Sequence, residues 1–143
     1  MRDELQQAKS LLEKESYTCV LCRDGQVICH RERGVAPLLA HVRAGEKMNG
    51  FVAADRVVGR AAAFLYVLLG VEEVYAGVLS RPALAVLRRY GIVAEYGTLT
   101  DVIQNRAGDG FCPMEQAVLT AKEPQEALLA IERRLVELNQ KKK

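Results

Sequence analysis

Asp55 and Arg56, followed closely by Gly59 and Arg60, are the residues of this sequence best suited to hold an anion. They stand where an apolar, strand-like stretch passes into a helix rich in alanine. The first N–H groups of a helix attract negative charge, and an arginine can bind a phosphate or carboxylate through two parallel hydrogen bonds. We predict that Arg56 or Arg60 takes the anion beside Gly59, and that Asp55 binds a hydroxyl or base edge or acts as a general base. The alternative is that Asp55 caps the helix and both arginines are solvated.

Cys112 is the second residue that could perform chemistry. If Pro113 is the first residue of a helix, Cys112 stands at its cap, and Glu115 can reach back to the N–H of the cap. A helix start stabilises a thiolate, which can serve as a nucleophile. We therefore treat Cys112 as a candidate catalytic nucleophile, with Asp55 or Glu115 handling the proton, and Met114 and Glu115 as candidate ligand-binding residues. The alternative is a core thiol that docks a short helix.

The segment Cys19-Val-Leu-Cys22 and the pair Cys29-His30 raise the question of a metal site. On a strand, residues three apart point to opposite faces, and no second Cys-x-x-Cys is present. We therefore predict core thiols on a hairpin, no bound metal and no cofactor. His41 is predicted to lie at the surface or in an interface.

Apolar periodicity and turn residues predict the elements that position these side chains. Asp24-Gly25 is a strong signal for a two-residue hairpin turn, and Ser80-Arg-Pro82 is typical of a capped helix start. The third helix is expected to begin at Arg56 or Val57. The predicted elements are helix 2–15, strands 17–23 and 26–32, helix 34–44, strand 50–54, helix 56–69, strand 73–79, helix 81–90, strand 92–96, and helices 112–119 and 124–139.

This order predicts an α/β protein with three α/β/α layers around a mixed five-stranded sheet. The first two strands are antiparallel, the later ones are parallel through right-handed crossovers, and helices cover both faces. The length predicts one domain over residues 1–143, with a frayed lysine tail at 141–143. Ligands in such sheets bind outside the carboxyl ends of strands, which is where the third helix is expected to start.

Composition narrows the classes of partner. The formal net charge is +2 and aromatic residues make up 6% of the chain, so nucleic acid is not an expected partner. The most apolar run, residues 61–71, is about half the ~20 residues of a membrane-spanning helix, so no membrane partner is expected. Because no signal-peptide pattern is present, we expect a cytoplasmic protein with reduced thiols.

Three segments, residues 32–39, 54–63 and 112–118, together resemble the DUF1893 family of uncharacterised prokaryotic proteins. The resemblance extends from about residue 16 to residue 138, and it implies a cytidine-deaminase-like fold. Zinc deaminases carry His-x-Glu and Pro-Cys-x-x-Cys at two helix starts. Here those places read Gly34-Val-Ala-Pro and Ala54-Asp-Arg-Val-Val-Gly. The expected scaffold is therefore free of zinc, and zinc-dependent deamination is not expected.

Three hypotheses for function follow. The first is a domain that binds a small anionic ligand, nucleotide-like or phosphorylated, between the helix starts at Gly34 and Asp55. Arg33 and Gly34 join the candidate ligand-binding residues because the deaminase-like arrangement would turn them toward that crevice. The second is a transferase or hydrolase that depends on Cys112. The third is a structural or regulatory homo-oligomer whose crevice is vestigial.

Overall fold

The computed structural model describes residues 3–104 and 112–141. Its elements follow the predicted order. Their bounds are α1 (Asp3–Lys14), β1 (Cys19–Arg23), β2 (Gln26–His30), α2 (Ala36–Arg43), β3 (Val52–Val58), α3 (Arg60–Leu69), β4 (Glu73–Ser80), α4 (Arg81–Arg89), β5 (Val93–Thr100), α5 (Pro113–Ala117) and α6 (Pro124–Lys141).

The strands form one mixed five-stranded sheet in the order β2-β1-β3-β4-β5. β1 is antiparallel to both β2 and β3, whereas β3, β4 and β5 are parallel to one another. This arrangement confirms the predicted mixed sheet. The β1–β2 hairpin turns at Asp24 and Gly25, whose φ angles of 48° and 84° are those that a tight hairpin turn requires.

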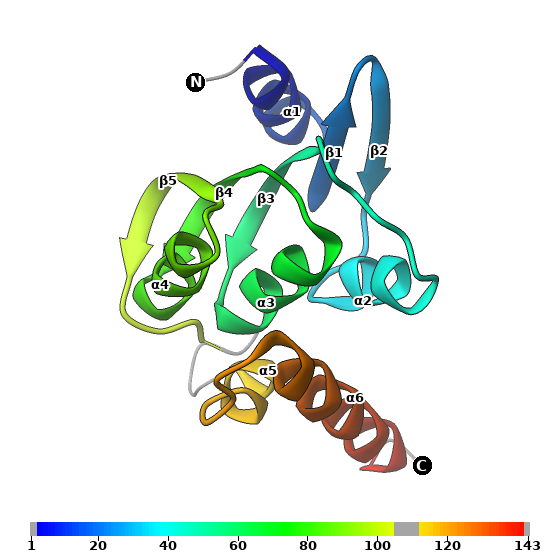
Figure 1. The fold of residues 1–143 in the computed structure, drawn as a ribbon, viewed down its shortest axis with the longest axis vertical. Helices are drawn as coiled ribbons and strands as arrows, with labels where there is room; N and C mark the ends of the chain where they lie inside the picture. The colour runs from blue at the N-terminus through cyan, green and yellow to red at the C-terminus, as the bar shows by residue number, and fades with distance from the viewer. Residues whose placement is uncertain (1–2, 105–111, 142–143) are drawn as a thin grey trace.

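Helices lie on both sides of the sheet. α1 covers one face, while α3 and α4 pack on the other, and α5 and α6 extend the structure beyond α3 (Figure 1). The α1 layer is a small apolar cluster of Leu5, Ala8, Leu12, Val20, Cys22, Val52, Ala54 and Tyr75. None of the helices in the described part of the chain is long and apolar enough to cross a membrane.

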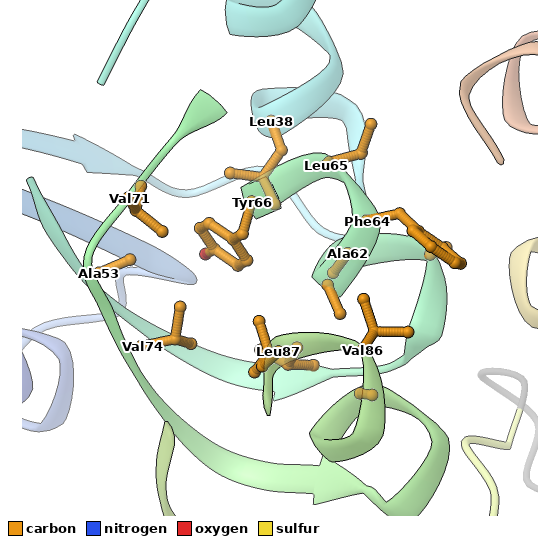
Figure 2. Close-up of a cluster of buried hydrophobic side chains, with 14 of the residues drawn as sticks. Leu38, Ala53, Ala62, Phe64, Leu65, Tyr66, Val71, Val74, Val86 and Leu87 are labelled. Carbon is orange, nitrogen blue, oxygen red and sulfur yellow. The ribbon is translucent and has the colours of Figure 1, made fainter. Parts of the chain in front are cut away.

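The larger core surrounds α3. Six consecutive residues, Ala61 to Tyr66, are buried, because the helix is enclosed by the sheet and by α2, α4 and α6. Its alanines let the helix backbone lie close to neighbouring elements. Phe64 and Tyr66 are the two largest fully buried side chains of the described residues, and Figure 2 shows the Tyr66 ring between Leu38, Ala53 and Val74. Gly70 ends the helix in the left-handed conformation, with a φ of 82°.

The boundary between β3 and α3 differs from the prediction. The strand was expected to end at Ala54, and the helix to begin at Arg56 or Val57. Instead β3 continues through Val58, and α3 begins at Arg60. Two charged residues, Asp55 and Arg56, fit inside a central strand because each has its own polar partners, on opposite faces of the sheet.

β5 is also longer than predicted, since it pairs with β4 as far as Thr100 rather than ending at Tyr96. Gly97 marks a close approach of the two backbones, because a Cβ there would lie 3.0 Å from the carbonyl oxygen of Gly77. At the other end of the chain, Lys141 belongs to α6. The remaining tail residues, 142 and 143, lie outside the described part of the protein.

Candidate functional site

The N-terminus of α3 holds an anion, and the anion is the side chain of Glu115. One carboxylate oxygen accepts a hydrogen bond from the Arg60 N–H at 2.6 Å, and the other accepts one from the Ala61 N–H at 2.8 Å. The Glu115 residue is 7% exposed. Glu115 was predicted to be able to cap its own helix, α5, but its carboxylate caps α3 instead. Two backbone N–H groups, aligned with the dipole of a buried helix, thus form a working oxyanion receptor.

Gly59 makes this contact sterically feasible. It is the N-cap residue of α3, in an extended conformation with φ −98° and ψ −174°, which any residue can adopt. A Cβ at this position would lie 2.4 Å from one Glu115 oxygen and 2.8 Å from the other. The glycine is therefore required by the carboxylate beside it rather than by the backbone conformation.

The Arg60 side chain binds the backbone of the segment that carries Glu115. Its guanidinium donates to the carbonyl oxygens of Val118 and Leu119, at the end of α5, and lies over the Phe64 ring at 5.0 Å. Each of the two segments, the start of α3 and α5, therefore supplies a side chain that binds backbone groups of the other. A negative side chain meets a helix start, and a positive side chain meets a helix end, as the two helix dipoles favour.

Arg56 makes its contacts on the face of the sheet that α1 covers, opposite the face that carries α3. Its guanidinium donates to the carbonyl oxygens of Leu12 at 2.8 Å, Glu15 at 2.8 Å and Tyr17 at 2.6 Å. These groups lie at and just beyond the C-terminal end of α1, where carbonyls lack partners within the helix. In this conformation Arg56 fastens α1 to the central strand.

We expect Arg56→Lys to lower the free energy of unfolding by about 1–2 kcal/mol, because one ammonium cannot reproduce three hydrogen bonds from a planar fork. Hydrogen exchange should increase first in α1. Arg81→Lys is the matched control, since Arg81 makes one exposed ion pair with Asp101. Equal exchange in the two variants would contradict the anchoring role of Arg56.

Asp55 belongs to a buried polar network on the α3 side of the sheet. Its carboxylate accepts a hydrogen bond from the Tyr66 hydroxyl at 2.7 Å, and that hydroxyl lies 3.2 Å from the Cys19 sulfur. Burial raises the pKa of Asp55 to about 6, although hydrogen bonds from Tyr66 and from the backbone N–H groups of Arg56 and Val57 oppose the shift. Burial, reinforced by the Asp55 charge, also raises the pKa of Cys19 and of Tyr66. A carboxyl that titrates near neutral pH is a common feature of functional sites and of buried structural networks alike.

The structure brings some predicted site residues together and leaves others apart. Gly59, Arg60 and Glu115 are in direct contact, and Asp55 lies four residues before Gly59 on the strand that leads to it. By contrast, Arg33 and Gly34 are exposed on the connection between β2 and α2.

The predicted nucleophile lies on the same short helix as Glu115. Cys112 is half-buried at the cap of α5, and its backbone N–H bonds to the carbonyl of Ile103. Met114 is half-buried against the core. The catalytic role of Cys112 stays a prediction.

Tyr66 and Cys19 were not recognised as partners of Asp55. The available signal was a single hydroxyl in an otherwise apolar helix, since a buried tyrosine usually finds a hydrogen-bond partner. Across residues 3–104 and 112–141, no group of three or more histidine, cysteine, aspartate or glutamate side chains is placed to hold a metal ion.

Comparisons with known proteins support the fold and a family. A crystal structure of a DUF1893 family protein (TM1506) from Thermotoga maritima matches with a TM-score of 0.85 and 24% sequence identity, covering 94% of this chain and 92% of that one. At this level of identity the likeness establishes the fold. A search of curated proteins found no match. The family described as TM1506, domain of unknown function (DUF1893), matches residues 7–135, so the chain belongs to the DUF1893 family.

Proposed function

We propose that this domain binds a small anionic ligand, nucleotide-like or phosphorylated, whose oxyanion replaces the Glu115 carboxylate at the start of α3. The supporting observation is the pair of hydrogen bonds from the N–H groups of Arg60 and Ala61 to that carboxylate. A phosphate presents two oxygens in much the same way as a carboxylate, so the same N–H pair can receive either group.

A ligand oxyanion can replace the Glu115 carboxylate because the helix that carries Glu115, α5, is short. α5 is five residues long, and its contacts with α3 are few beside those of α3 with α4 or α6. If α5 moved away, the Arg60 guanidinium would lose the carbonyls of Val118 and Leu119 and become free for the incoming oxyanion. In open α/β sheets, ligands bind outside the carboxyl ends of the strands, and the junction between β3 and α3 lies at such an end.

The test is binding of inorganic phosphate and cytidine 5′-monophosphate, followed through the backbone amide signals of Arg60 and Ala61 by NMR. In the wild-type protein Glu115 competes with the probe, and in Glu115→Ala it does not. We expect both amides to shift on titration, and the variant to bind about tenfold more tightly, a difference of ~1.4 kcal/mol. A further gain for the nucleotide over phosphate would identify a nucleoside-binding surface.

Glu126→Ala is the control, because Glu126 is an exposed carboxylate in the first turn of α6. It should bind both probes as the wild type does. Should Glu115→Ala prove unfolded, Glu115→Gln removes the charge while keeping the shape of the side chain. If the two amides do not respond to either probe in a folded Glu115 variant, Glu115 is a permanent structural cap and the proposal is wrong.

A further inference from the structure

The last helix carries apolar side chains on two opposite sides. α6 lies at the edge of the molecule, where one side of it packs on α3 and α5 (Figure 1). Ala127 and Ile131, on that inner side, are buried. Leu129 and Val136 are large hydrophobic residues too, yet they are 56% and 55% exposed. They stand two helical turns apart, so they share one face of the helix, opposite the inner side.

The exposed leucine and valine belong to a stripe that runs the length of α6. At 3.6 residues per turn, a stripe about 100° wide contains Gln125, Leu129, Glu132, Arg133, Val136 and Gln140. We call this stripe the outer face of α6. Its members are exposed except for Glu132, which is half-buried and forms an ion pair at 3.2 Å with Arg43 of α2. The middle of the outer face borders a shallow groove, and Arg43 stands on the other side of that groove.

The residues of the outer face are complementary to themselves. When a second copy of α6 lies antiparallel to the first, about a two-fold axis between Glu132 and Arg133, positions equally far from the axis face each other. Leu129 then faces the partner's Val136, and Glu132 faces the partner's Arg133. The two glutamines at the ends of the face also meet each other, so an amide faces an amide. Every group on the face thus meets a group of suitable chemistry.

From this match we propose that the outer face of α6 is the contact surface of a symmetric homodimer, in which the α6 helices of two copies pair antiparallel. The symmetry makes each contact twice, so two ion pairs at the centre are flanked by two apolar contacts. Sliding one helix by a turn would bring the partner's Glu132 onto Leu129, and a charge would lose water without gaining a partner. The charges therefore fix the register of the pair.

The charge balance of the groove favours a second copy over other partners. Two arginines, Arg43 and Arg133, and two carboxylates, Glu132 and Glu137, line it. Such a surface gives no net attraction to a strongly acidic or basic partner. A helix that lies on anionic lipid carries an excess of lysine and arginine, which this face does not have. Because one helix face makes a small interface, we expect a dimer with a Kd of about 1–100 µM.

The experiment is sedimentation velocity of the full chain in a reducing buffer, at concentrations from well below to well above this Kd. We expect a monomer–dimer equilibrium. Leu129→Glu and Arg133→Glu should each weaken dimerisation by at least about tenfold, because each sets a carboxylate against an apolar or acidic group of the partner. Leu119→Glu and Arg88→Glu are the matched controls, since these residues are exposed outside α6. Both controls should dimerise as the wild type does.

Charge reversal tests the pairing itself. In Arg133→Glu two acidic centres face each other, and in Glu132→Arg two basic ones do. Each variant alone should be monomeric where the wild type dimerises, whereas an equimolar mixture of the two should form a heterodimer. Glu132→Arg also removes the ion pair with Arg43, but that pair is largely exposed, so the fold should be little affected. Circular dichroism checks the fold of each variant, and Val136→Glu replaces any variant that is unfolded.

Three results would overturn the proposal. The first is wild-type protein that stays monomeric at every concentration. The second is a dimer that persists unchanged in Leu129→Glu and Arg133→Glu, which would place the interface on another surface. The third is a wild-type monomer that binds vesicles of phosphatidylglycerol and loses this binding in Leu129→Glu, because the outer face would then bind lipid. A heterodimer from the two charge-reversal variants, neither of which dimerises alone, would establish the pairing.

Discussion

Replacing Gly59 with alanine should lower the free energy of unfolding by about 3 kcal/mol, because two charge-assisted hydrogen bonds are lost together. The new Cβ would lie 2.4 Å from a Glu115 oxygen, and that carboxylate would have to leave the start of α3. Glu115→Ala should cost about as much, since it leaves the same N–H groups of Arg60 and Ala61 without their partner. Urea denaturation measures both changes.

The two substitutions should not be additive. In Glu115→Ala the steric conflict no longer exists, so adding Gly59→Ala should change the stability little, and the double variant should resemble either single one. Gly59→Ala combined with Glu126→Ala is the control pair, which we expect to be additive because Glu126 is exposed on α6. Additivity in the Gly59 and Glu115 pair would mean that the glycine acts through the backbone and that the carboxylate contact is incidental.

The stability of the protein should fall by about 2 kcal/mol as pH rises from 4 to 7, through Asp55 alone. The pKa of Asp55 is raised from 3.8 to about 6 in the folded protein, chiefly by burial. Between these two values the folded state keeps a proton that the unfolded chain has released, so raising the pH favours unfolding until the folded carboxyl has also ionised. The expected loss is set below the full value of the shift because Asp55 keeps some contact with solvent.

Asp55→Asn should remove this part of the pH dependence. The informative quantity is the difference in the free energy of unfolding between wild type and variant, measured by urea denaturation at pH 4, 5, 6 and 7. It should change by about 2 kcal/mol across the series, in favour of the variant at higher pH. Asp24→Asn, which removes an exposed carboxylate from the hairpin turn, is the control. Parallel curves for wild type and Asp55→Asn would place the Asp55 carboxyl in a more hydrated setting than its contacts indicate.

Several elements could be predicted from sequence because their determinants are local. The hairpin follows from Asp24-Gly25, whose positive φ angles are set by the turn itself. The start of α4 follows from Ser80, whose hydroxyl accepts the N–H of Ala83 three residues later. Gly70 ends α3 for a similarly local reason. In each case the residue and the group that it satisfies are near neighbours in the chain.

The end of β3 could not be predicted in this way. A polar pair after four apolar residues is typical of a strand end, and Asp55-Arg56 was interpreted so. The two side chains remain in the strand because Tyr66 binds one and the carbonyls at the end of α1 bind the other. Those partners come from other elements, on opposite faces of the sheet, and periodicity along the strand does not reveal them.

The candidate site likewise combines features that are set locally in the sequence with contacts that only the tertiary structure decides. An anion receptor at the start of α3 is implied by the sequence, because helix N–H groups and their dipole are local properties of any helix start. The group that occupies the receptor is a matter of packing, since Glu115 is 55 residues away from Arg60 in the chain. The contact between the Nε2 atoms of His30 and His41, 2.8 Å apart, also requires the end of a strand to meet the end of a helix. Local chemistry thus follows from neighbouring residues, whereas the choice of partner depends on which surfaces the fold brings within hydrogen-bonding distance.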